Sequence, residues 1–218
     1  MQVQTRTLTL SDVVLPGTGI LRNVALVVGF GRIGQITTVT IPIDWILRNV
    51  ALVVGFGFLT AVLAQIAVYL SPLVPLTGQT LGVVLSGAVL GSRKGALSQM
   101  AYLGAGAMGL PVFAAGHAGL PYMMGPTAGY LVGFVAAAYV VGLLAERGWD
   151  RRVWTMAVAM VAGLLVIHLS GIAWLSMLVP FSAIVGIELP FVPGEIIKVL
   201  LAAGAFPSAW ALLRKGKK

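Results

Sequence analysis

The sequence predicts an all-α integral membrane protein with six transmembrane helices and both termini in the cytoplasm. Its composition is the first observation, because 59% of the 218 residues are hydrophobic and only 9% are charged, against about 25% charged in a soluble domain. The second is a series of six apolar runs, and the third is the placement of Lys and Arg between them. The net charge of +8 forms no basic stripe with interleaved aromatics, so we expect no nucleic-acid partner.

An N-terminal extension is expected to precede the membrane domain. We place the extension at residues 1–45, lying in the cytoplasm or on the membrane surface, and the membrane domain at residues 46–218. Residues 20–31 are an identical copy of residues 46–57, but two arginines leave the first copy a short apolar stretch, far below the roughly 20 residues that cross a bilayer as a helix. We therefore expect the first copy to lie at the surface.

Six apolar runs between polar breaks are the expected membrane spans. They cover residues 50–70, 80–90, 96–110, 126–145, 153–178 and 194–213. The second and third runs are short and rich in glycine, which lets helices approach each other closely. We expect both of these helices to extend into their flanking loops.

The cations define the expected orientation. Thirteen of the 14 Lys and Arg residues precede the first run, separate the second from the third or the fourth from the fifth, or follow the sixth. If the helices alternate in direction, all thirteen lie on one side, which the positive-inside rule makes cytoplasmic. The opposite loops, at residues 71–78, 111–125 and 179–193, contain neither Lys nor Arg. A binding site built from these loops would open to the outside.

Glu195 and Lys198 are the leading candidates for a binding site. They lie in the apolar segment 190–198, at the start of the sixth run, where an ionisable side chain is costly unless it is paired or hydrated. A spacing of i to i+3 places both on one helix face. The alternative is a structural ion pair that holds two helices together.

Other polar side chains near the outer loops could bind a ligand or cap a helix: Gln79, Thr80, Thr127 and Tyr130. Trp174 could line an apolar pocket or lie in the outer aromatic belt. His168 is expected to be a structural hydrogen-bonding residue rather than a proton relay.

Small residues on the first run form a face that invites another helix. Gly57 and Ala61, with Ala64 nearby, give the small-xxx-small spacing found where membrane helices touch. This face could dock a partner subunit or pack inside the chain, and spacing does not decide between them.

Catalytic and metal-binding motifs are missing from the sequence. It contains no Walker A motif, no paired-histidine metal spacing and no Gly-x-Ser-x-Gly elbow, so we expect no enzyme, no cofactor and no bound metal. A membrane enzyme that uses Glu195 and Lys198 as an acid–base pair remains a weaker alternative, as does a purely structural membrane subunit. Any uphill transport would draw its energy from another protein.

Several collinear motifs resemble one known family, the BioY proteins, which are the biotin-binding S components of energy-coupling factor transporters. The motifs span residues 74–87, 91–96, 109–113, 125–134 and 193–198. The resemblance implies a six-helix S-component fold in the cell (inner) membrane of a bacterium or archaeon. It also implies capture of biotin from outside, with a transmembrane coupling subunit and two ATPases as partners. A sibling S component for another vitamin is the main alternative.

Residue by residue, the resemblance carries over with three departures. The family's last motif usually reads Pro-Gly-Asp-x-x-Lys, and its charged residues contact the ligand, whereas this chain has Glu195 in place of Asp. The family's Ala-xxx-Ala step, which meets the coupling subunit, is matched only in part by Gly57 and Ala61. Gly78 stands where the family commonly has a larger apolar residue.

Overall fold

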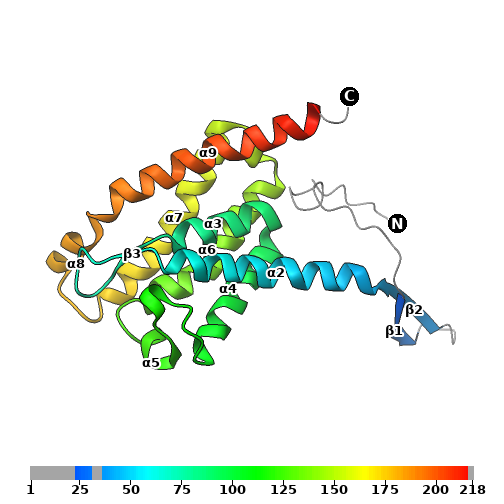
Figure 1. Ribbon diagram of the computed structural model, residues 1–218, viewed down its shortest axis with the longest axis horizontal. Helices are drawn as coiled ribbons and strands as arrows, with labels where there is room; N and C mark the ends of the chain where they lie inside the picture. Colours follow the sequence, from blue (N-terminus) through cyan, green and yellow to red (C-terminus); the bar gives the residue numbers. More distant parts are fainter. Residues whose placement is uncertain (1–22, 31–35, 216–218) are drawn as a thin grey trace.

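The computed structural model describes residues 23–30 and 36–215, which fold mainly into helices (Figure 1). The long helices are α2 (Ile43–Ala64), α3 (Gln79–Leu90), α4 (Ser92–Ala107), α6 (Ala128–Glu146), α7 (Val153–Leu175) and α9 (Phe191–Lys215). The shorter elements are β1 (Asn23–Phe30), β2 (Ile36–Pro42), β3 (Ala67–Val68), β4 (Leu76–Thr77), η1 (Ala114–Gly116), α5 (Gly119–Met123), η2 (Trp149–Arg151) and α8 (Phe181–Glu188).

Four helices in the described part of the chain are long and apolar enough to cross a membrane. They are α2, α6, α7 and residues Phe191–Leu212 of α9. Helices α3 and α4 have 12 and 16 residues. At 1.5 Å per residue these lengths correspond to about 18 and 24 Å, which is less than the roughly 30 Å hydrocarbon core.

The end of the first predicted span was wrong. We expected helix through residues 65–70, but α2 ends at Ala64 and β3 then pairs antiparallel with β4. Gly78 extends the pairing of this hairpin beside the end of α2, since its N–H donates to the Ile66 carbonyl oxygen at 3.1 Å. A Cβ at Gly78 would lie 2.8 Å from the Leu63 carbonyl oxygen, so the close approach requires glycine. The hairpin delivers β4 to the start of α3.

The duplicated sequence adopts two different structures. Most of the first copy forms β1, which pairs antiparallel with β2, whereas the identical residues 46–57 are helical within α2. Intrinsic preferences differ by less than about 1 kcal/mol per residue between such states. The neighbouring segments therefore decide which structure each copy forms.

Helix α6 lies at the centre of the bundle, packed against α3, α4 and α7. Glycines make these contacts close. A Cβ on Gly142 would lie 2.3 Å from the backbone nitrogen of Ser92 at the start of α4, and one on Gly129 would lie 2.3 Å from the Ser170 carbonyl oxygen on α7. Backbone contact of this kind is typical of membrane helices, where small residues allow close packing.

The small-residue face of α2 is buried inside the chain. Ala64 is fully buried and Ala61 is 7% exposed, while a Cβ on Gly57 would lie 2.9 Å from the Ser98 carbonyl oxygen on α4. Of the two alternatives for this face, the structure supports internal packing. A partner helix could reach these residues only if α4 moved away.

Candidate functional site

The first turns of α9 carry a largely buried ion pair. Glu195 is 8% exposed, and Lys198 Nζ lies 2.8 Å from Glu195 Oε1. The helix begins at Phe191, so both side chains fall on the same face one turn apart. The structure thus places both residues on one helix face, as the spacing predicts, and it also contains the ion pair that was the alternative interpretation.

Residues of β4 and of the first turn of α3 complete the environment of this pair. Lys198 Nζ donates to the Thr77 carbonyl oxygen at 2.7 Å and to Thr80 Oγ1 at 2.7 Å. The Thr80 hydroxyl in turn donates to Glu195 Oε1 at 2.9 Å and lies 3.1 Å from Oε2. The two opposite charges are thus paired with each other, and both hydrogen-bond to the same hydroxyl. These contacts offset part of the free-energy cost of removing the charges from water.

Thr77 connects this cluster to a second buried network. Its hydroxyl donates to Gln79 Oε1 at 2.8 Å, and Gln79 Nε2 donates to the Tyr102 hydroxyl at 2.5 Å. Tyr102 is 2% exposed and lies on α4. The sequence did not indicate Tyr102, because nothing in the surrounding glycine-rich run distinguishes it from an ordinary core aromatic residue.

A second carboxylate, Glu188 at the end of α8, lies between two side chains from other helices. The Tyr130 hydroxyl on α6 donates to Glu188 Oε1, and His168 Nδ1 on α7 lies 2.7 Å from Glu188 Oε2. The Tyr130 and His168 rings lie 6.4 and 5.5 Å from the ring of Phe191. Sequence analysis assigned Glu188 no role, although an acid at the end of an apolar segment in a loop without cations was a usable signal.

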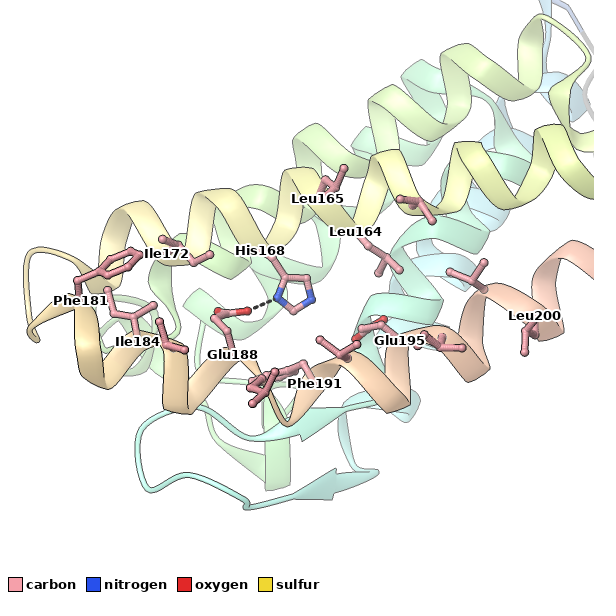
Figure 2. Close-up of a pocket in the computed structure, with 16 residues that line it drawn as sticks. Leu164, Leu165, His168, Ile172, Phe181, Ile184, Glu188, Phe191, Glu195 and Leu200 are labelled. Carbon is pink, nitrogen blue, oxygen red and sulfur yellow. Dashed lines mark hydrogen bonds and ion pairs between the residues drawn. The ribbon is translucent and has the colours of Figure 1, made fainter.

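An apolar cavity of about 580 Å³ lies between α7, α8 and α9 and brings both carboxylates to one space. Figure 2 shows apolar side chains of the three helices along it, with His168 extending from α7 toward Glu188. Its polar lining is limited to His168, Glu188 and Glu195. A mainly apolar cavity with a few polar groups is the usual form of a small-molecule site.

The other predicted residues are distributed unevenly around this cavity. Four of them do not line the cavity but belong to the hydrogen-bond networks of its two carboxylates. The network of Glu195 includes Lys198, Thr80 and Gln79, and that of Glu188 includes Tyr130. Two predicted ligand residues lie elsewhere. Trp174 donates through Nε1 to the Gly125 carbonyl oxygen at 3.0 Å, and Thr127 lines a separate hollow of about 270 Å³ with loop residues. The tertiary structure therefore does not bring Thr127 and Trp174 to the Glu195 cluster.

No group of three or more Asp, Glu or His residues that could hold a metal ion occurs in the described part of the chain. The charged groups around the cavity instead form hydrogen-bonded pairs. Such an arrangement can present a carboxylate to a molecule that offers hydrogen-bond donors.

Fold and site together define a multi-pass membrane protein with a largely apolar small-molecule cavity near one end of its helices. The chain belongs to the BioY family, whose family model matches residues 25–215. This match begins earlier in the chain than the motifs recognised in the sequence, which start at residue 74.

Individual relatives agree with this assignment. The chain is 38% identical over 164 residues to a protein named biotin transporter BioY from Rhizobium etli, covering 66% of this chain and 87% of the relative. It is 43% identical over 147 residues to a protein of the same name from Thermotoga maritima, covering 66% and 85%. A solved structure is similar in fold, with a TM-score of 0.66 at 22% identity over 82% of this chain and 95% of the other. That structure is described as the S-component for biotin from an ECF-type ABC transporter.

Proposed function

We propose that this chain is the substrate-capture (S) subunit of a vitamin transporter and that it binds biotin. The observation that carries this proposal is the Glu195–Lys198–Thr80 cluster beside an apolar cavity, in a chain of the BioY family. Transport would be completed by a transmembrane coupling subunit and two ATPases.

The chemistry of biotin suits both the Glu195 carboxylate and the apolar cavity beside it. Its ureido ring offers two N–H donors and one carbonyl acceptor, and its valeryl chain and thioether ring are apolar. Glu195 lines the cavity, and its Oε2 atom has one hydrogen-bond partner, Thr80. Because a carboxylate can accept about four hydrogen bonds, Glu195 retains acceptor capacity for the ureido N–H groups.

The surrounding cavity supplies the apolar contacts. Leucine, isoleucine, valine and phenylalanine side chains from α7, α8 and α9 make up most of its lining (Figure 2). The Glu188–His168 pair adds a second polar group in the same space. A ligand with polar groups at both ends and an apolar middle can therefore be held along its whole length.

We further propose six transmembrane helices with both termini in the cytoplasm of a bacterium or archaeon, and a site that opens outward. Two features, one visible in Figure 1 and one in the sequence, support this arrangement. The labels β3, α5 and α8 lie toward one end of the bundle, while α2 begins and α9 ends toward the other. The loops at the first end are those without Lys or Arg.

Titration calorimetry of the purified protein in detergent tests the proposal directly. We expect biotin to bind at nanomolar to low-micromolar concentration without ATP, since the S subunit alone would carry the site. A sibling S component would instead release heat with another vitamin, such as riboflavin or thiamine, and none with biotin. That result would refute the biotin assignment and leave the family assignment intact.

A further inference from the structure

A polar hollow lies at the turn between α6 and α7, at the opposite end of α7 from the Glu188–His168 pair. Its volume is about 540 Å³. One short segment forms the lining, which consists of Arg147, Gly148, Trp149, Arg151, Arg152 and Thr155. Its three arginines contribute three guanidinium groups. In Figure 1 this segment lies beside the later half of α9. The biotin proposal assigns no role to it.

The acidic residue of this segment faces away from the hollow. Asp150 is 1% exposed, and its Oδ2 atom accepts a hydrogen bond from Trp210 Nε1 of α9 at 2.5 Å. Burial raises the pKa of the Asp150 carboxyl above its ordinary value, against the opposing effects of the Trp210 hydrogen bond and of Arg151. Asp150 is therefore a structural link to α9, and the arginines dominate the charge of the hollow.

Two of the arginines are positioned by different means. The guanidinium carbon of Arg151 lies 5.0 Å from the centre of the Trp210 ring, an arrangement that holds the planar cation in place. Arg152 is the N-cap residue of α7, in extended conformation and without a side-chain cap hydrogen bond. The hollow that the arginines line thus lies at the start of α7. The positive end of the helix dipole and the guanidinium donors both favour an anion there.

The hollow also lies next to a surface suited to lipid. Val153 and Trp154, the first residues of α7, are 51% and 83% exposed. Trp at such a position is typical of the membrane interface, at the level of the lipid headgroups. A phosphate bound by these arginines would therefore sit where its acyl chains could run along α7.

We propose that this hollow binds the phosphate of an anionic phospholipid headgroup. Arginine forks match phosphate oxygens in pairs, and basic pockets between membrane helices on the cytoplasmic side are known sites for anionic lipids. The positive-inside rule accounts for cations on this side of the protein, but it does not require three of them to line one hollow together with a helix start.

Native mass spectrometry of the purified protein with added phosphatidylglycerol or phosphatidylcholine tests this site. We expect phosphatidylglycerol to bind more tightly, and Arg147→Gln and Arg152→Gln each to weaken it by at least about fivefold through loss of a paired phosphate contact. Arg151 is left unchanged because it packs on Trp210. Arg93→Gln is the matched control, since it removes an exposed cation from the α3–α4 turn, outside the hollow.

Three outcomes would overturn the proposal. Equal binding of the two lipids would show that the headgroup charge is not recognised. An equal loss in Arg93→Gln would show a general effect of charge. Tight binding of inorganic phosphate that displaces the lipid at equal concentration would show a site for free phosphate. Biotin titration of Arg152→Gln should match the unmodified protein, so this test and the test of biotin binding can fail independently.

Discussion

Glu195 and Lys198 are two charges, one buried and one largely buried, that depend on each other. Their bond of 2.8 Å is supported by Thr80, which contacts both. Removing one partner of such a pair leaves the other charge buried without compensation, at a cost of roughly 2–5 kcal/mol. The affinity for a ligand that hydrogen-bonds to one of these groups should therefore fall when either residue is removed.

Substitution of this pair should reduce biotin affinity. We expect Glu195→Gln and Lys198→Ala each to weaken binding by at least about tenfold, or roughly 1.4 kcal/mol. Glu195→Asp should be the mildest change, because it keeps the charge and restores the aspartate common in the family. Titration calorimetry of the folded fraction, after size-exclusion chromatography, measures the effect.

The other carboxylate of the cavity is the matched control. Glu188 contacts Tyr130 and His168 rather than a lysine. Glu188→Gln therefore leaves no ammonium group without its partner, and it should weaken biotin binding less than Glu195→Gln. If the Glu195 and Lys198 variants lose thermal stability but bind biotin as before, the pair is a structural link and the ligand is held elsewhere.

At the scale of the helix, two nearby glycines on α2 allow the effect of helix packing on stability to be measured apart from the effect of helix propensity. A Cβ on Gly57 would lie 2.9 Å from a backbone oxygen of α4, whereas one on Gly55 would meet nothing within 4 Å. We expect Gly57→Ala to destabilise the protein by about 1–3 kcal/mol, because overpacking pushes α2 from α4. Gly55→Ala should have no effect or stabilise by up to about 1 kcal/mol, since alanine favours helix.

Thermal unfolding of the two variants in detergent, followed by transport assays in cells, distinguishes the alternatives for this face. A lowered midpoint for Gly57→Ala alone would support internal packing. If Gly57→Ala instead keeps the midpoint and biotin affinity of the unmodified protein but loses uptake, the face docks a partner subunit after all.

At the scale of the whole molecule, the orientation in the membrane can be measured because the chain contains no cysteine. We expect Ser182→Cys, at an exposed position on α8, to react with a membrane-impermeant thiol reagent added to intact cells. Arg93→Cys, in the cation-bearing α3–α4 turn, should react only after the cells are opened. Gly148 is unsuitable for such labelling, because a cysteine would be strained at its φ of 83°. The reverse pattern would place the biotin site on the cytoplasmic side.

The sequence by itself determined the membrane class, the order of the apolar helices, the family and the shared helix face of Glu195 and Lys198. These features depend on hydrophobicity, charge placement and local helix spacing, which are properties of neighbouring residues. It also indicated the alternatives for the small-residue face of α2 without deciding between them.

Only the tertiary structure decided which residues meet. It placed Thr80 on Glu195 across 115 residues of chain and Glu188 between Tyr130 and His168. It separated Thr127 and Trp174 from the Glu195 cluster, although both belong to the same predicted outer region. It also made the eight residues Asn23–Phe30 a strand and their identical copy, residues 49–56, part of a helix. These outcomes depend on contacts between separate segments, most of them far apart in the chain. The energies of such contacts exceed the small conformational preferences that a local sequence carries.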